Sequence, residues 1–165
     1  MSHAAQAQGS GPILKQNTTN ILASEGFTFS VPKGWDTEED IAKRRFFLIA
    51  PGSTSVPPII WLTLKRDNLE LSTADAMGQF FDRTRMSPGI EKVELTTVKR
   101  GAGGTFSIVT WEEVKEGVLL TNWNTILRLK GNGRVFVTAS CRTTGKEAHR
   151  AAFLAFLASI KGDQP

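Results

Sequence analysis

Apolar and polar residues alternate with a period of two along several short stretches of the chain. In the first, Phe27-Thr-Phe-Ser-Val-Pro-Lys-Gly-Trp35, three apolar residues alternate with two hydroxyl residues before a proline and a glycine. This alternation predicts a strand over 27–31 with one buried face. Residues 36–45 follow and are almost entirely charged, so they predict a loop or a single helical turn outside the core.

Two stretches, 46–50 and 59–64, are apolar on both of their faces. This composition predicts strands in the middle of a sheet that is covered on both sides. Farther along, the period of two returns in four runs that predict an antiparallel meander, namely 93–97, 106–110, 119–129 and 135–141. In the first run Val93, Leu95 and Thr97 are the positions expected to face inward.

Two segments have helical spacing and a sequence typical of a helix start. Ser72 and Asp75, and again Thr144 and Glu147, have the spacing of a capping box. Helices are therefore predicted over about 73–87 and 145–161. Their apolar stripes are expected to contain Ala74, Met77, Phe80, Phe81 and Thr84 in the first helix, and Ala152, Phe153, Phe156, Leu157 and Ile160 in the second.

The order of these elements, β-β-β-α-β-β-β-β-α, predicts an α+β fold. We expect an α/β/α sandwich with a central, largely antiparallel sheet of about seven strands and two main helices. The 165-residue length fits one domain, taken as residues 21–165. Residues 1–20 are polar and are expected to form a flexible N-terminal segment.

Charge and hydropathy exclude two classes of protein. The net charge is +4, from 20 basic and 16 acidic residues, but the basic residues are scattered, with Lys43-Arg44-Arg45 as the only run of three. Nucleic-acid binders cluster their positive charge, so no nucleic-acid partner is expected. The longest apolar runs, such as 57–62, are too short to span a bilayer, which predicts no transmembrane segment.

Residues that carry catalytic or metal chemistry are scarce. The single cysteine, Cys141, excludes an internal disulfide and is expected to be a buried, inert thiol on the apolar face of its strand. The two histidines are His3 and His149, and the second is expected to be a partly exposed structural residue. Acidic groups in 36–40 and 112–116 are explained by solvation. We therefore expect no catalytic residue, no metal and no cofactor, with a hydrolase as a remote alternative.

The N-terminal segment bears on localisation. Ala5-Gln-Ala7 has the small-x-small form of a signal-peptidase site, although no apolar segment precedes it in the sequence. This form favours a periplasmic or otherwise exported protein. A cytoplasmic protein with a plain polar N-terminus is the alternative.

Four pieces of the sequence together resemble one superfamily. They are the opening Phe-x-Phe-x-Val-Pro-x-Gly-Trp, the helix over 74–86, the Gly-Arg-Val-Phe-Val-Thr-Ala strand at 133–139 and the closing Phe-Leu-Ala-Ser-Ile160. They are similar to the superfamily of the photosystem protein PsbP and the Mog-type Ran-release factors, with DcrB-like lipoproteins and type VI secretion adaptor chaperones as bacterial relatives. The resemblance covers about residues 26–161. It implies an α/β/α sandwich that works mainly through binding, and none of the matching positions is a shared catalytic residue.

These observations predict a non-enzymatic binding protein, either an adaptor or chaperone or a periplasmic accessory protein. A toxin-neutralising immunity protein is the alternative. The partner is expected to be another protein, and a homodimer stays open. Two surfaces are candidates, the strand face of Asn122, Asn124 and Arg128, and the corner of Trp35, Asp36, Glu39, Asp40 and Arg44. The strand face is favoured, because amides opposite Trp123 are unexpected in a fully covered sheet.

Overall fold

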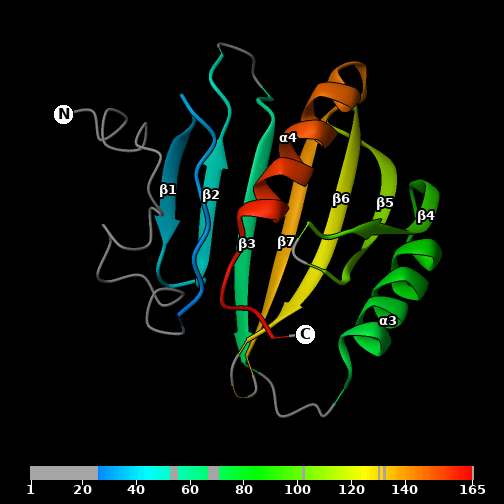
Figure 1. Cartoon of the computed structure of the whole chain (residues 1–165). Coiled ribbons are helices and arrows are strands. Elements are labelled where there is room, and N and C mark those ends of the chain that lie inside the picture. The colour runs from blue at the N-terminus through cyan, green and yellow to red at the C-terminus, as the bar shows by residue number, and fades with distance from the viewer. Residues whose placement is uncertain are drawn as a thin grey trace.

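The chain folds into a seven-stranded sheet in the order β1-β2-β3-β7-β6-β5-β4, in which every neighbouring pair is antiparallel (Figure 1). A computed structural model describes residues 26–52, 56–66, 71–101, 103–129, 131 and 133–164, so the predicted segment 1–20 lies outside the described residues. The strands are β1 (Asp36–Asp40), β2 (Arg45–Ile49), β3 (Ile59–Arg66), β4 (Ile90–Lys99), β5 (Thr105–Lys115), β6 (Val118–Arg128) and β7 (Gly133–Arg142). The predicted α+β class and meander are confirmed.

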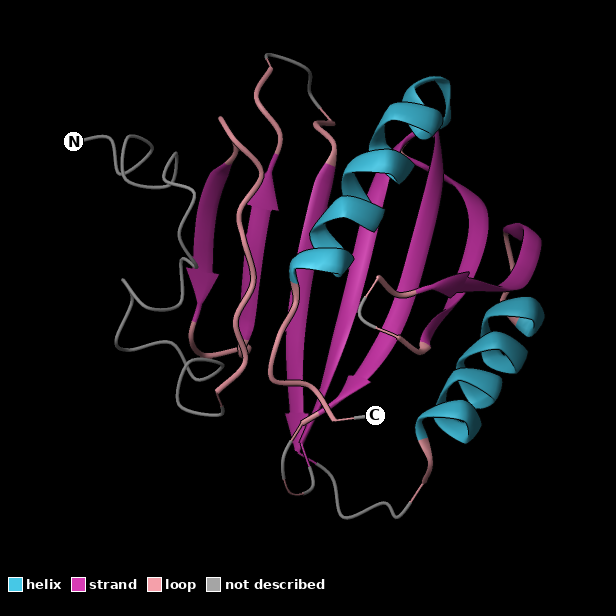
Figure 2. Ribbon diagram, in the orientation of Figure 1, coloured by secondary structure: helices cyan, strands magenta, loops and turns pink. Residues whose placement is uncertain are grey.

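Two α-helices of the described part pack on opposite faces of this sheet. Helix α4 (Lys146–Ser159) runs across β3 and β7 in Figure 1, whereas α3 (Thr73–Met86) packs on β4, β5 and β6. Figure 2 shows both helices in the same view as Figure 1. Because successive residues of a strand point to opposite faces, each face has its own apolar cluster.

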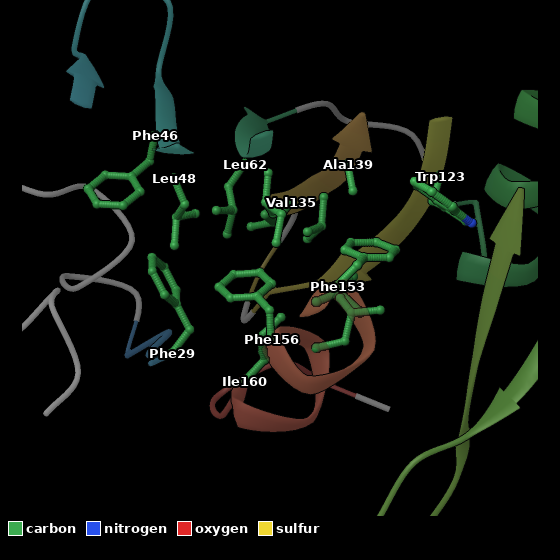
Figure 3. Close-up of a cluster of buried hydrophobic side chains, with 14 of the residues drawn as sticks. Phe29, Phe46, Leu48, Leu62, Trp123, Val135, Ala139, Phe153, Phe156 and Ile160 are labelled. Carbon is green, nitrogen blue, oxygen red and sulfur yellow. The ribbon is translucent and has the colours of Figure 1, made fainter. Parts of the chain in front are cut away.

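The larger cluster lies between the sheet and α4 (Figure 3). Phe29 packs edge-on against Phe46 and Phe156, with ring centroids 5.5 and 5.1 Å apart. Val135, Val137 and Ala139 of β7 lie beneath the helix and are fully buried. Each such large apolar side chain contributes about 1.5–3 kcal/mol when it leaves water, so this cluster is the main stabilising core.

The opening segment buries the predicted face but does not join the sheet. Phe27, Phe29 and Val31 are all buried, as the alternation predicts. The prediction of a strand over 27–31 is wrong, because Thr28 and Ser30 form isolated bridges rather than a ladder, and Thr28 pairs with Lys161 after α4. Thr28 exchanges two backbone hydrogen bonds with Lys161, 2.9 and 2.8 Å long. Two hydrogen bonds at one residue pair fix the segment over the core without extending a ladder.

The charged stretch after Trp35 forms an edge strand, so the predicted loop over 36–45 is wrong for its first half. β1 pairs with β2 from Asp36 opposite Ile49 to Asp40 opposite Arg45. The side chains stay exposed or partly exposed, so none of them enters the core, as expected. A strand needs only backbone partners, and an edge strand can carry charges that solvent covers.

Two predictions about inward-facing positions also fail. β2 and β3 bury one of their faces. The prediction that their other face is also covered is wrong: its side chains are partly exposed, because α3 packs on β4, β5 and β6 instead. In β4, the last strand of the sheet, Leu95 and Thr97 are exposed, although Leu95 lies opposite the buried Val109.

The two helix starts differ from each other. Ser72 Oγ accepts a 3.0 Å hydrogen bond from the Asp75 amide, so the first capping box is confirmed. Ala74 is exposed, and Ala76 takes the buried position beside Met77. The second capping box does not form, because a 3-10 turn, Thr143–Gly145, precedes α4 and Gly145 occupies the N-cap position without a side-chain hydrogen bond.

Candidate functional site

The predicted strand face of β6 is mostly closed. Asn122 and Asn124 are only 3% and 2% exposed, so the expectation of an open face at these two residues is wrong. Asn122 Nδ2 donates to Glu113 Oε1 at 3.1 Å, and Asn124 Nδ2 donates to Thr138 Oγ1 at 2.8 Å. These neighbours explain how amides fit inside a sheet face. Arg128, at the end of β6, is exposed.

One atom of this amide pair has no hydrogen-bond partner among the described residues. Asn124 Oδ1 is buried and accepts no hydrogen bond in the described part of the chain. A buried polar atom without a partner costs free energy, so it marks a place where a donor would be favoured. Asn124 is therefore retained as a candidate binding residue, beneath the surface rather than on it.

The predicted corner is divided between core and surface. Trp35 is 9% exposed and belongs to the core under α4, so it plugs the sandwich and is not an exposed interface aromatic. Asp36 and Glu39 are exposed on β1, and Asp40 is partly exposed. Arg44 lies in the turn before β2 with a left-handed backbone, φ 51°. The acidic residues and Arg44 stay near one sheet edge, while Trp35 turns inward.

The structure brings apolar side chains, rather than the predicted amides, to an accessible part of the sheet. We call Phe47, Ile49, Ile59, Trp61 and Thr63 the open sheet face. All five alternate onto one face of β2 and β3 and are partly exposed. The sequence pattern indicates this surface, because 46–50 and 59–64 are apolar on both faces. Two helices are too few to cover both faces of a seven-stranded sheet, so some of these apolar side chains stay accessible.

Register connects the open sheet face with the predicted residues. Opposed residues in antiparallel strands share a face, and one such row runs from Glu38 through Phe47, Trp61 and Thr138 to Asn124. Carboxylates of β1 therefore flank the aromatic side chains on one side. Buried hydroxyl and amide groups flank them on the other.

His149 is a buried residue whose environment differs from the sequence-based expectation. It is 4% exposed rather than partly exposed, and it lies between two indoles. Its ring stacks on Trp35 at 5.8 Å with an interplanar angle of 10°, and it meets Trp123 edge-on at 5.8 Å. Nε2 donates to the Ile59 carbonyl oxygen at 3.0 Å. Burial lowers the pKa of His149, and the hydrogen bond to Ile59 partly opposes that shift. The role is structural.

A polar pocket lies on the α4 side of the sheet, where that helix begins. Its volume is about 280 Å³, and its lining comes from β4, β5, β6 and the first turns of α4. Glu112, which the sequence placed among solvated surface acids, is 6% exposed here. Lys92 Nζ lies 2.7 Å from its Oε2, and Lys146 Nζ lies 3.8 Å from its Oε1. Hydrogen bonding to Glu112 raises the pKa of Lys92.

Metal-binding groups, the cysteine and the helices of the described residues bear on the sequence-based expectations. No group of three or more histidine, cysteine or acidic side chains there has a metal-binding arrangement. Cys141 is buried as predicted, and burial raises the pKa of its thiol to about 11. Among the same described residues, no helix is long and apolar enough to cross a membrane.

Comparison with known proteins shows the fold. No family model matches the chain, and no curated relative matches it. LpqN of Mycobacterium tuberculosis, described as involved in cell envelope biogenesis, superposes with a TM-score of 0.66 at 15% identity, over 84% of this chain and 83% of LpqN. PA94 of Pseudomonas aeruginosa, a protein of unknown function described as a putative regulator, superposes with a TM-score of 0.57 at 12% identity. The match covers 84% of this chain and 92% of PA94. A Bacteroides thetaiotaomicron structure gives 0.53 at 18% identity, over 84% of this chain and 45% of that one. These likenesses establish a shared fold.

Proposed function

We propose that this chain is a non-enzymatic binding protein of the cell envelope, which acts as an adaptor, chaperone or accessory protein toward a protein partner. The observation that carries the proposal is the open sheet face, in which Phe47, Ile49, Ile59 and Trp61 stay partly exposed on β2 and β3. Contiguous exposed apolar side chains bordered by polar groups are typical of interaction surfaces. Aromatic side chains supply most of the binding energy at such surfaces.

The surroundings of the open sheet face support a protein partner. Acidic side chains of β1 lie beside it, with Asp36 opposite Ile49 and Glu38 opposite Phe47. On the other side lie the buried hydroxyl residues Thr138 and Ser140, and Asn124 Oδ1 accepts no hydrogen bond from any described residue. An apolar centre with a charged and hydrogen-bonding border is the usual anatomy of a protein interface.

The assignments of role and compartment rest on one structural neighbour and on the resemblance of the sequence. LpqN is described as involved in cell envelope biogenesis, and we extend an envelope role, periplasmic or otherwise exported, to this chain as part of the proposal. The resemblance to the PsbP and Mog-type superfamily, whose members work mainly through binding, supports a non-enzymatic role. His149, the one histidine of the described residues, is committed to structural contacts.

The test compares two matched pairs of cross-strand neighbours. Phe47 and Trp61 are opposed on the open sheet face, whereas Val114 and Leu119 are opposed and exposed at the tip of the β5–β6 hairpin. Each pair is replaced by threonine, which keeps strand propensity. Purified variants are cross-linked in extract of the source cells, and captured proteins are quantified by mass spectrometry.

We expect Phe47→Thr with Trp61→Thr to abolish capture of the partner, and Val114→Thr with Leu119→Thr to retain it. Sedimentation of the purified chain then shows whether the captured partner is a second copy. Circular dichroism melting of both variants checks that they fold. Full capture by the folded Phe47→Thr with Trp61→Thr variant would refute the proposed surface.

A further inference from the structure

The polar pocket on the α4 side of the sheet has the composition of a ligand site and is separate from the open sheet face. Its charged lining consists of Lys92, Lys146 and Arg150, and of Glu94, Glu112 and Glu147. Three threonine hydroxyls and the indole of Trp123 complete it. A volume of about 280 Å³ is near the lower end of small-molecule sites, about 300–1,000 Å³.

The centre of this pocket is a carboxylate held in a fixed position. Glu112 is almost fully buried, and two ammonium groups from different elements, Lys92 of β4 and Lys146 of α4, neutralise it. A buried charge must be compensated in this way. In turn, Glu112 fixes the two lysine side chains beside the pocket.

The backbone at Lys92 is unusual and serves the same arrangement. Lys92 has a left-handed backbone, φ 52°, inside the β4 bulge between Glu91 and Glu94. This conformation is disfavoured for a residue with a side chain, and bulges of this kind re-aim side chains near functional sites. Here the bulge directs the Lys92 ammonium to Glu112, whereas a regular strand would continue its alternation unchanged.

We propose that this pocket binds a small zwitterion that carries both an ammonium and a carboxylate, as a free amino acid or a short peptide does. Glu94 and Glu147, which form no ion pair among the described residues, would repel an anion, and Arg150 would repel a cation. An apolar ligand would remove water from Glu94, Glu147 and Arg150 without compensation. A ligand with both charges satisfies both sets at once.

The side chains divide into two groups by charge. Glu94, Glu147 and Arg150 form none of the ion pairs of the described residues, so they are available to a ligand. Arg150 and Lys146 receive the carboxylate, and Glu94 and Glu147 receive the ammonium. The hydroxyls of the threonine residues accept or donate the remaining hydrogen bonds.

The test is a nuclear magnetic resonance titration of the full chain, read at the Trp123 indole N–H, which a Trp123→Phe variant assigns. The probes are glycine, 4-aminobutyrate and glycylglycine, which differ in the separation of their two charges. Glycinamide carries only the cation, N-acetylglycine only the anion, and glycerol neither. We expect saturable binding of at least one zwitterion in the millimolar range, and at least about tenfold weaker binding of the other three probes.

Two variants and one control locate the binding. Arg150→Gln and Glu94→Gln alter exposed side chains and are each expected to weaken zwitterion binding about threefold to fivefold, the range for partly solvated charge pairs. Arg83→Gln, on the exposed side of α3, should leave the binding unchanged. The proposal is overturned if no probe shifts the Trp123 signal, if N-acetylglycine, glycinamide or glycerol binds as well as the zwitterions, or if Arg83→Gln weakens binding as much as Arg150→Gln. These outcomes leave the open sheet face untested, so the two proposals fail separately.

Discussion

Replacement of His149 by alanine tests the packing of α4 on the sheet. The imidazole stacks on Trp35, meets Trp123 edge-on and donates from Nε2 to the Ile59 carbonyl oxygen. His149→Ala removes all three contacts and leaves a cavity between two indoles. Because the three partners come from separate parts of the chain, the loss affects the core as a whole.

The expected cost follows from these contacts. Each aromatic pair contributes about 0.5–1.5 kcal/mol, and a carbonyl left without its donor costs about 1–3 kcal/mol when buried. We expect a loss of about 3 kcal/mol in the free energy of unfolding, taking the lower part of the second range because the carbonyl is only partly buried. In a domain of this size 1 kcal/mol lowers the melting temperature by about 2–4 °C, so the shift is about 6–12 °C.

The assay is urea unfolding followed by tryptophan fluorescence and circular dichroism, with heat denaturation in parallel. Arg150→Ala serves as the control, because Arg150 is the next residue of α4 and is exposed. We expect the control to change the free energy of unfolding by less than about 0.5 kcal/mol. A loss below about 1 kcal/mol in His149→Ala would refute the assigned role of the ring.

The same side chain should make stability depend on pH. Burial lowers the pKa of His149 in the folded protein below its ordinary value of 6.5, so the unfolded chain binds the proton more readily. Stability is then complete above that ordinary value and falls as the pH decreases toward the lower folded pKa. We expect this loss between pH 7 and pH 5 in the wild type and a smaller loss in His149→Gln. Parallel curves for the two proteins would contradict this.

Three further predictions concern single contacts. Burial raises the pKa of Cys141 from 9.0 to about 11. A thiol reagent at pH 8 should therefore modify the native protein at least about 100-fold more slowly than the urea-unfolded protein. Equal rates would show an accessible thiol. Gly162→Ala should lower the melting temperature more than Gly131→Ala. Both glycines have left-handed backbones, φ 92° and 75°, but a Cβ at Gly162 would also collide with the Gly26 backbone oxygen. Equal losses in melting temperature would contradict that collision. Asp163→Asn removes the charge from the mostly buried 2.5 Å pair with Arg100 and should cost about 3 kcal/mol, because the Arg100 guanidinium loses its counter-charge. A cost below about 1 kcal/mol would contradict this role.

Local patterns in the sequence determined most of the elements. The period of two predicted the four strands of the meander, and helical spacing predicted α3 and α4 within one or two residues of their bounds. These predictions hold because an element that buries one face must repeat apolar residues at its own period. Cys141 was predicted as buried for the same reason.

Strand pairing was decided elsewhere in the molecule. Residues 27–31 alternate like a strand, but Thr28 forms an isolated bridge with Lys161, whereas the charged 36–40 form β1 because β2 offers a free edge. These hydrogen bonds join backbone N–H and C=O groups, which every residue except proline carries whatever its side chain. Alternation therefore predicts which face is buried but does not predict which chain segment becomes the neighbour.

The candidate sites depended even more on tertiary structure. Burial of Asn122 and Asn124, the stacking of His149 between two indoles and the ion pairs of Glu112 all require residues that are distant in sequence. A single sequence shows that a polar residue is present but not which partner satisfies it. Only the packing of two helices on opposite halves of one sheet left β2 and β3 with a partly exposed apolar face, because each helix covers only part of the sheet.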